Sequence, residues 1–252
     1  MTTIRIIPKL EVKNENLIKG IHLEGLRIVG KPEEAAFKYA NDGADELIYI
    51  DLVASLYQRN NWINIVRKTA EKIYIPLTVG GGIRSLEDAK TFLRAGADKV
   101  AINTAITQNP KLITQISQKF GSQAMVASLE VQKKIDGQYE IYSDSGRTPT
   151  GLEPIAWAKE VVKRGAGEIL LTFIHQDGTE QGYDLELLKQ IATQVSVPVI
   201  ASGGAGKLED LLEAVLTGKA DALALASLLH FNKTTVSKIK KYLKSKKIKI
   251  RL

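Results

Sequence analysis

The stretch Ile75-Pro-Leu-Thr-Val-Gly-Gly-Gly-Ile-Arg-Ser-Leu-Glu-Asp88 decides the fold, because a second version of it occurs later, as Val197-Pro-Val-Ile-Ala-Ser-Gly-Gly-Ala-Gly-Lys-Leu-Glu-Asp210. Each version has the pattern of a short apolar strand, a glycine turn and the start of a helix. Glycine lets backbone N–H groups approach a ligand closely, and the N-terminus of a helix favours an anion. The two turns therefore predict two phosphate sites, or one substrate with a phosphate at each end.

The repeat extends beyond the glycine turns. Asp42-Gly-Ala-Asp-Glu-Leu-Ile-Tyr resembles Arg164-Gly-Ala-Gly-Glu-Ile-Leu-Leu, and Pro8-Lys-Leu-Glu-Val12 resembles Ala127-Ser-Leu-Glu-Val131. The offset between matching residues stays near half the chain length. This self-similarity predicts two copies of a module with four strand–helix units. We expect two duplicated half-barrels, at about residues 1–122 and 123–252, within one domain.

Strand and helix patterns alternate eight times along the chain. The predicted strands are short and apolar, as expected for strands buried on both faces, and cover residues 4–9, 46–51, 75–79, 99–103, 125–130, 168–173, 197–201 and 222–226. The predicted helices are amphipathic and cover residues 33–42, 62–71, 86–95, 110–120, 153–164, 184–195, 208–217 and 234–244. With 252 residues, this alternation predicts an α/β fold that closes as a (β/α)8 TIM barrel. An open doubly wound sheet is the alternative, but it explains the half-chain repeat less well.

Two insertions are longer than a minimal turn. Residues 13–31 carry three glycines and are predicted to form a loop that could close over a substrate. Residues 133–142 have Asp136-Gly137 between two strand-like runs, which predicts a hairpin.

Composition limits the classes of function. The chain has no cysteine and no apolar run long enough to span a membrane, and its first residues lack a signal-peptide pattern. We therefore expect a cytoplasmic protein with no membrane partner. The net charge of +7 comes from a basic segment at Lys238–Arg251. A nucleic-acid site is one interpretation, but apolar residues at helical spacing favour a terminal helix with a solvated basic face, so no nucleic-acid partner is expected.

The carboxyl ends of the predicted strands carry the candidate catalytic groups. Glu11 and Glu130 occupy matching positions of the two copies and should face each other across the barrel mouth. Paired carboxylates suit general acid–base chemistry, in which one group accepts a proton and the other donates one. The alternative is that one of them is a salt-bridged residue of the rim.

Polar groups beside the glycine turns strengthen the phosphate prediction. The candidates in the two copies are Gly81, Gly82, Asn103 and Thr104, and Gly203, Gly204, Ala226 and Ser227. Hydroxyl and N–H groups from adjacent loops would converge on one anion. Lys19 is a plausible phosphate contact, although a loop lysine is more often solvated. The three histidines lack metal-ligand spacing, so we expect neither a metal nor another cofactor.

The opposite rim has a charge pattern of its own. Arg5, Glu46, Lys99 and Glu168 all lie at the starts of predicted strands. From the residues alone, such charges indicate a solvated or ion-paired cap on the barrel.

These motifs resemble the cyclase subunit of imidazole glycerol phosphate synthase, the HisF family of histidine biosynthesis, over essentially the whole chain. The matching motifs are Arg5-Ile-Ile-Pro8, Gly43-Ala-Asp-Glu46, Pro76-Leu-Thr-Val-Gly-Gly-Gly82, Ala95-Gly-Ala-Asp-Lys99, Gly165-Ala-Gly-Glu-Ile-Leu-Leu-Thr172, Gln176-Asp-Gly-Thr179, Gly182-Tyr-Asp184 and Ala201-Ser-Gly-Gly-Ala-Gly206. The resemblance implies an enzyme that uses ammonia from a partner glutaminase on a substrate with two phosphates. The implied products are imidazole glycerol phosphate and an aminoimidazole carboxamide ribotide.

The resemblance also implies residue roles. It makes an ammonia gate of the Arg5, Glu46, Lys99 and Glu168 rim, and it implies that a HisH-like glutaminase docks on this face with Asp98 and Gln123 as contacts. The implied substrate- and phosphate-binding residues are Lys19, Asp51, Gly81, Gly82, Asn103, Thr104, Thr172, Asp177, Gly178, Gly203, Gly204, Ala226 and Ser227.

The chain departs from the family pattern at its centre. The two catalytic aspartates of the family fall on Glu11 and Glu130, which are one methylene longer, and Lys9 is unusual nearby. These departures resemble paralogs that use glutaminase-derived ammonia to place an amidino group on a surface-polysaccharide sugar, which is the first alternative. The second alternative is a non-catalytic partner that activates the glutaminase. A barrel that only binds phosphorylated metabolites would show no dependence on ammonia.

Overall fold

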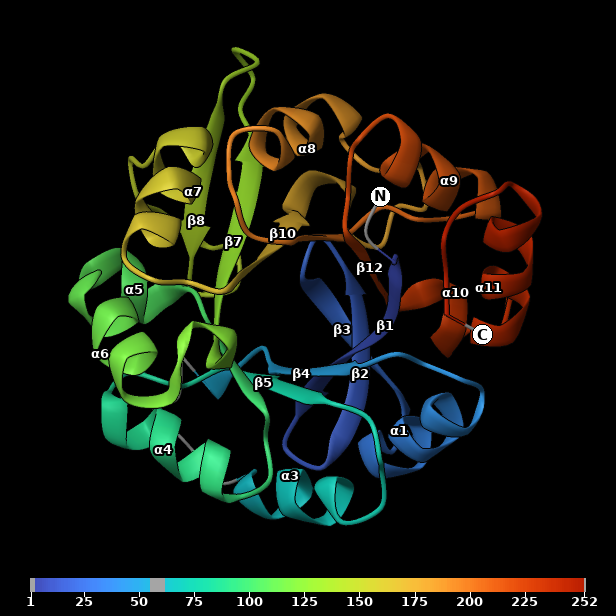
Figure 1. The fold of residues 1–252 in the computed structure, drawn as a ribbon, viewed down its shortest axis with the longest axis horizontal. Coiled ribbons are helices and arrows are strands. Elements are labelled where there is room, and N and C mark those ends of the chain that lie inside the picture. Colours follow the sequence, from blue (N-terminus) through green and yellow to red (C-terminus); the bar gives the residue numbers. More distant parts are fainter. Residues whose placement is uncertain (1–2, 55–61, 252) are drawn as a thin grey trace.

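The computed structural model describes residues 3–54 and 62–251. Within them, eight parallel strands close into a barrel (Figure 1), because the last pairing of the series joins β10 to β7. The barrel strands are β1 (Arg5–Lys13), β4 (Leu47–Asp51), β5 (Leu77–Gly80), β6 (Lys99–Ile102), β7 (Met125–Lys133), β10 (Glu168–Phe173), β11 (Val199–Ser202) and β12 (Ala222–Leu225). The predicted (β/α)8 TIM barrel is confirmed, and the open-sheet alternative is wrong.

The helices surround the barrel on its outside (Figure 1). The long helices are α1 (Pro32–Asn41), α3 (Ile63–Ala70), α4 (Leu86–Arg94), α6 (Lys111–Phe120), α7 (Pro154–Lys163), α8 (Leu185–Ala192), α9 (Leu208–Leu216) and α11 (Val236–Ser245). Each overlaps a predicted helix. Short helices that were not predicted follow two strands directly: α5 (Thr104–Gln108) and α10 (Ser227–His230).

Two strands begin two residues later than predicted. β5 and β11 start at Leu77 and Val199, just after Pro76 and Pro198. Proline has no N–H to donate to a neighbouring strand, so the ladder begins at the next residue. The proline carbonyls still accept hydrogen bonds, from Leu47 at 2.9 Å in the case of Pro76.

The strands bury both of their faces, which explains their uniformly apolar sequences. Their inward side chains form a small cluster in the barrel lumen: Ile7, Ile48, Ala101, Val126, Leu170, Ile200, Ala222 and Ala224. Their outward side chains join the larger core under the helices, where Tyr49, Phe92 and Trp62 pack together. The lumen is therefore packed, as is usual for this fold.

An aspartate recurs at the turn that enters a strand. Asp45, Asp98 and Asp221 each accept a hydrogen bond from the backbone N–H of a neighbouring strand, namely from Ile6, Leu77 and Val199, at 2.8, 2.8 and 3.1 Å. These bonds satisfy a backbone donor that would otherwise be unpaired at the barrel floor. The aspartate that follows alanine in Gly43-Ala-Asp45, Gly96-Ala-Asp98 and Gly218-Lys-Ala-Asp221 thus has a common structural role.

The prediction of a loop at residues 13–31 is wrong. This segment forms a hairpin of β2 (Asn16–Ile21) and β3 (Glu24–Gly30), which continues from β1 by antiparallel pairing. Ile18 packs under the hairpin with Leu23, Leu52 and Ile174. The predicted second hairpin is confirmed: β7 pairs with β8 (Tyr139–Ser143), and Lys134 donates to the carbonyl of Gln138 at 2.7 Å across the turn.

The basic C-terminal segment forms helix α11, as predicted. Val236, Ile239 and Leu243 are buried against the barrel, while most of its lysines point to solvent. Lys240 is the exception, because it is buried and pairs with Asp45 at 2.7 Å. Among the helices of the described residues, none combines the length and apolarity that crossing a membrane requires.

Candidate active site

A first cavity of about 360 Å³ opens at the carboxyl end of the barrel. The residues that matter for its chemistry are Asp51, Gly81, Gly82, Arg84, Asn103, Thr104, Ser128, Glu130, Asp144 and Ser145. Gly81 has φ +97°, and a Cβ there would lie 2.3 Å from the carbonyl oxygen of Asp51. Only glycine fits this turn without displacing backbone.

A second cavity lies at the matching glycine turn, but its volume is only about 20 Å³. It is lined by Lys9, Lys19, Asp177, Gly178, Ser202, Gly203, Gly204, Ala226 and Ser227, among others. Gly203, the counterpart of Gly81, has φ +88°, and a Cβ there would lie 2.9 Å from the carbonyl oxygen of Phe173. The two cavities therefore share a backbone design and differ in the space that side chains leave.

Glu11 lies in an ion-pair cluster beside the second cavity, and its side chain is fully buried. Lys19 Nζ lies 3.0 Å from Glu11 Oε2 and 2.5 Å from Asp177 Oδ1. Lys9 Nζ lies 3.1 Å from Glu11 Oε1. Burial alone would raise the pKa of Glu11, but Lys19 and Lys9 more than offset it, so that the pKa falls to about 2. Glu11 is therefore ionised at neutral pH.

Glu130 lies in the first cavity, in a different environment. Burial raises the pKa of Glu130 to about 7, against the opposing effects of Lys9 and of hydrogen bonds from the Gly146 N–H and Asn103. Within the described residues, its Oε2 has no hydrogen-bond partner. A carboxyl group in this state can hold a proton near neutral pH and give it up to a substrate.

The two glutamates thus suit opposite proton roles. Glu11 is a carboxylate that can accept a proton, and Glu130 is a carboxyl that can donate one. The strands that carry them, β1 and β7, lie on opposite sides of the barrel ring (Figure 1). Sequence reasoning left open whether one of them is a salt-bridged residue. Glu11 is indeed ion-paired, but it is buried at the cavity instead of exposed on the rim.

Comparison with known proteins identifies the family of this chain. Residues 5–235 match the model of the family described as histidine biosynthesis protein. The imidazole glycerol phosphate synthase subunit HisF of Legionella pneumophila is 58% identical over 83% of this chain and 99% of the relative. The proteins of the same name from Alkaliphilus metalliredigens and Prochlorococcus marinus are 45% and 47% identical, and each alignment covers all of this chain and at least 99% of the relative. The chain belongs to the HisF family.

The structure brings the residues expected from the HisF resemblance into two groups. The first cavity holds Asp51, Gly81, Gly82, Asn103, Thr104 and Glu130, and the second holds Lys19, Asp177, Gly178, Gly203, Gly204, Ala226 and Ser227. Thr172 is buried in β10 and pairs in register with Glu130 and Ser202. Their proposed contacts with substrate remain predictions.

Lys19 is buried, whereas a loop position suggests a solvated lysine. It belongs to β2, is only 4% exposed and reaches the carboxylate of Asp177. Burial would lower its pKa, but Glu11 and Asp177 overcome this and raise it, so Lys19 stays charged. The hairpin thus delivers a fixed cation to the second cavity.

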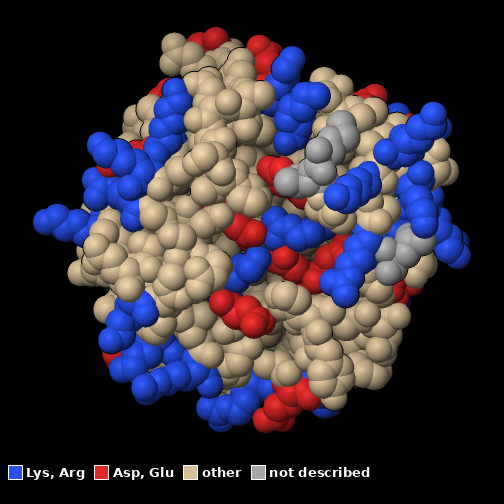
Figure 2. All heavy atoms as spheres, viewed as in Figure 1, with Lys and Arg blue, Asp and Glu red and all other residues tan. Residues whose placement is uncertain are grey.

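The opposite end of the HisF barrel is covered by a ring of four charges. Arg5 lies 2.6 Å from Glu46 and 2.7 Å from Glu168, and Lys99 lies 2.9 and 3.0 Å from the same two residues. Figure 2 shows basic and acidic side chains meeting at the centre of this face. Burial opposes ionisation of Glu46, but Arg5 and Lys99 outweigh it and lower its pKa. The expected ion-paired cap is confirmed. The role of this ring as an ammonia gate stays a prediction.

Several residues of the first cavity were missed by sequence reasoning. Ser128 precedes Glu130 by two positions on β7, so the alternation of the strand could have placed it on the same face. Asp144 and Ser145 reach the cavity from the turn after β8, where both have positive φ. Asp144 lies outside the predicted strands. Its backbone N–H donates to the Thr104 hydroxyl at 3.0 Å, and only the folded chain brings these two residues together.

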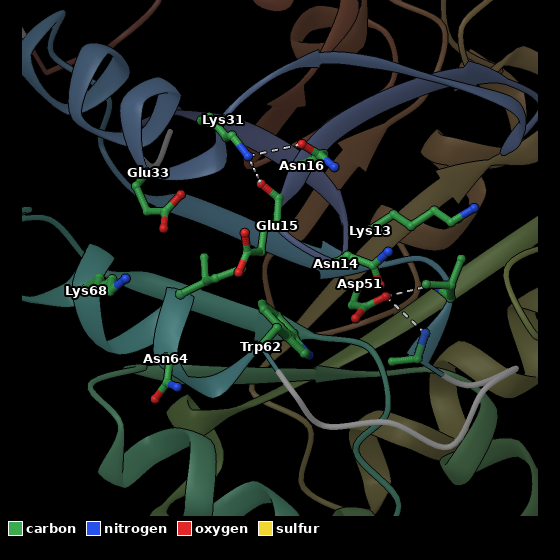
Figure 3. A pocket seen from close by; sticks show the side chains of 13 residues that line it. Lys13, Asn14, Glu15, Asn16, Lys31, Glu33, Asp51, Trp62, Asn64 and Lys68 are labelled. Carbon is green, nitrogen blue, oxygen red and sulfur yellow. Dashed lines mark hydrogen bonds between the residues drawn. The ribbon is translucent and has the colours of Figure 1, made fainter.

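A larger cavity of about 890 Å³ is lined by the β1–β2 turn, the start of α1, the end of β4 and residues of α3. Figure 3 shows that Lys13, the last residue of β1, and Asn14, in the turn before β2, stand near Asp51. Asp51 Oδ1 accepts hydrogen bonds from the N–H groups of Val53 and Ala54 at 2.9 and 3.0 Å. Burial raises the pKa of Asp51, and these two bonds act against the rise. Asp51 also lines the first cavity, so the two spaces adjoin at this residue.

Proposed function

We propose that this chain is the cyclase subunit of imidazole glycerol phosphate synthase, which forms imidazole glycerol phosphate and aminoimidazole carboxamide ribotide from a bisphosphate substrate and ammonia. The relatives carry this enzyme's name. The observation that carries the proposal is the pair of glutamates between two glycine-turn cavities. Glu11 is held ionised and Glu130 holds a proton near neutral pH.

In this mechanism the two phosphates of the substrate occupy the two cavities. Backbone N–H groups of the glycine turns, together with Thr104 in one cavity and Ser227 in the other, would hold them. Such anchoring places the reacting centre between Glu11 and Glu130. Glu130 then supplies a proton and Glu11 accepts one during ammonia addition and ring closure.

We further propose that the ammonia comes from a glutaminase subunit, HisH-like, docked on the face with the charge ring. Asp98 and Gln123 both belong to segments that enter barrel strands at this end, at the starts of β6 and β7. Arg5 and Lys99 would move from their glutamate partners to admit ammonia into the barrel. The proposed reaction involves neither a membrane nor a nucleic acid.

The first experiment measures turnover of the bisphosphate substrate with free ammonium. We expect both products to appear in equal amounts. If the substrate is not converted although a glutaminase binds tightly, the result favours the sugar-amidination alternative. A sugar acceptor is then the next substrate to assay. If Glu11→Gln and Glu130→Gln leave every activity of the complex unchanged, the chain is a non-catalytic partner.

The second experiment tests the gate. Lys99→Met removes one cation of the ring, and the matched control is Lys90→Met, which removes an exposed lysine paired with Glu87. We expect Lys99→Met to lower glutamine-driven turnover while ammonium-driven turnover stays near that of the wild type. Equal loss of both activities would contradict a gate and indicate a purely structural ring.

A further inference from the structure

We propose that Asp177 is a specificity-determining residue, whose carboxylate holds Lys19 in the second cavity until a phosphate of the substrate takes its place. This inference deepens the proposed function and rests on it for the identity of the substrate. The exchange itself, of one anion for another at a buried lysine, requires no turnover and can be tested with inorganic phosphate.

Asp177 lies where an anion would bind in the second cavity. Among the described residues that line this cavity it is the one acid, while Lys9 and Lys19 are the cations. Its side chain lies against the glycine turn, because a Cβ added to Gly203 would lie 3.4 Å from Asp177 Cβ. Asp177 Oδ1 lies 2.5 Å from Lys19 Nζ, and Oδ2 lies 3.9 Å from Lys9 Nζ. The carboxylate thus occupies the lysine contacts that a phosphate in this cavity would use.

The second cavity is too small for a phosphate while Asp177 is in this position. Its volume is about 20 Å³, which is room for about one water molecule. The first cavity, at about 360 Å³, is much larger. A phosphate can therefore enter the second cavity only when a lining side chain moves away.

The carboxylate of Asp177 can move while its backbone stays in place. The Asp177 N–H donates to the carbonyl oxygens of Phe173 and Ile174 at 2.9 and 3.1 Å. The Asp177 carbonyl oxygen accepts from the N–H of His22 at 2.8 Å. These bonds fix the main chain and leave rotation about the Cα–Cβ bond as the movement that releases Lys19.

The two lysines would keep their positions during this exchange. Glu11 Oε2 lies 3.0 Å from Lys19 Nζ, and Glu11 Oε1 lies 3.1 Å from Lys9 Nζ. Because Glu11 is fully buried, it holds both ammonium groups from within the fold while Asp177 gives up its contacts. A phosphate would then meet two cations that are already ordered, which lowers the entropic cost of binding.

The exchange would favour a substrate with two phosphates over one with a single phosphate. Any anion that enters the second cavity must displace Asp177, so this cavity binds every free anion more weakly than its lysines would otherwise allow. A substrate whose other phosphate is held in the first cavity is present at a high effective concentration and can displace the carboxylate. Each product of the proposed reaction carries one phosphate, so the return of Asp177 to Lys19 would favour product release.

The test is a titration of the substrate-free protein with inorganic phosphate at about pH 8, where phosphate is mainly a dianion. The amide chemical shifts of Gly82 and Thr104 report binding in the first cavity, and those of Gly203 and Ser227 report binding in the second. In the wild type we expect the second cavity to bind phosphate more weakly than the first.

Asp177→Asn should strengthen binding in the second cavity, because a neutral amide is a weaker partner for Lys19. We expect the dissociation constant of the second cavity to fall about tenfold and that of the first to stay within about twofold. The matched control is Glu180→Gln, which removes a carboxylate of the same loop that pairs with Lys233. In this control both dissociation constants should stay within about twofold of the wild-type values.

A double-mutant cycle separates displacement from simple repulsion between Asp177 and phosphate. If Asp177 acts through Lys19, the gain from Asp177→Asn should shrink to about threefold or less in a Lys19→Met background. A gain that persists there at full size overturns the proposal, as does an unchanged or larger dissociation constant in Asp177→Asn alone. If Asp177→Asn does not fold, the wild-type titration decides, because a second cavity that binds phosphate as tightly as the first also overturns the proposal.

Turnover of the bisphosphate is a separate measurement. If the bisphosphate is not converted, the phosphate titration still decides whether the exchange occurs, and only the proposed reaction fails. If the bisphosphate is converted but the titration gives a contrary result, only the role of Asp177 fails. The two failures are thus distinguishable.

Discussion

The two cavities of the barrel mouth have the same glycine turn but opposite contents. The first cavity has a volume of about 360 Å³ and contains a protonatable Glu130, whereas the second has a volume of about 20 Å³ and lies beside two lysines and the ionised Glu11. The comparison teaches that the repeat preserves backbone geometry while side chains set charge and space. An anion in the second cavity meets fixed cations, and one in the first meets mainly N–H and hydroxyl groups.

The largest expected effects come from removing each of the two carboxyl groups in turn. We expect Glu11→Gln and Glu130→Gln to reduce ammonium-dependent turnover by about 10²- to 10⁴-fold, because each removes a proton-transfer group. Glu11→Gln should also destabilise the fold by about 3–5 kcal/mol, since Lys9 and Lys19 lose their shared partner. Glu130→Gln should not, because the charged form of Glu130 is itself unfavourable.

Steady-state kinetics and urea denaturation measure the two effects. Glu87→Gln, on the exposed surface of α4, is the control and should alter neither. Equal stability losses for the two active-site variants would contradict the electrostatic difference between the cavities.

The next test replaces glycines in the two glycine turns. Gly81→Ala and Gly204→Ala each place a Cβ within 2.3 Å of a backbone carbonyl oxygen at positive φ, so we expect losses of about 3 kcal/mol or more. Gly137 is the matched control, because it has φ +84° with no atom within 4 Å of an added Cβ. Gly137→Ala should cost about 1 kcal/mol. Equal losses at all three sites would mean that φ alone matters, which chemical denaturation can decide.

The pH dependence of stability sharpens the comparison further. Burial gives Glu130 a pKa of about 7 in the folded protein, above the usual glutamate pKa of 4.5. The folded state therefore binds more protons between these values, and stability falls by about 3 kcal/mol as pH rises from about 4.5 to 7. Glu11 has the opposite sign: its contribution is present above about pH 4.5 and is lost as pH falls toward about 2.

Thermal denaturation across this pH range checks both signs. In Glu130→Gln the decline between pH 4.5 and 7 should be smaller by about 3 kcal/mol than in the wild type. A decline of the same size in both proteins would show that Glu130 does not titrate in this window.

The smallest effect compares the two helices that follow the glycine turns. Ser85 caps α4 by accepting from the N–H of Asp88 at 3.1 Å, whereas Lys207 at the same position of α9 offers no acceptor. Ser85→Ala should cost about 1 kcal/mol, and Lys207→Ser should stabilise the fold by up to about 1 kcal/mol. Urea midpoints measure both, and a destabilising Lys207→Ser would show that the two helix starts are not equivalent.

Most of the fold could be predicted from the sequence, because apolar strands and glycine turns carry local signals. The hairpin at residues 13–31 could not be predicted, since the sequence does not show that its lysine, Lys19, is buried. Lys19 becomes buried only because Asp177, 158 positions away, reaches it. Both catalytic candidates could be placed from the repeat. Their different proton affinities could not, because these depend on burial and on Lys9, Lys19 and Asn103, which tertiary structure brings near.

The composition of the cavities has a consequence for dividing the chain. Glu130 and Ser145, from the second repeat, line the cavity built on Gly81, while Lys9 and Lys19, from the first repeat, line the cavity built on Gly203. Each half therefore supplies side chains to the cavity built on the glycine turn of the other half. Two copies of one half would assemble two identical cavities instead of the two different ones described above. Neither half could therefore be removed or exchanged without altering both cavities.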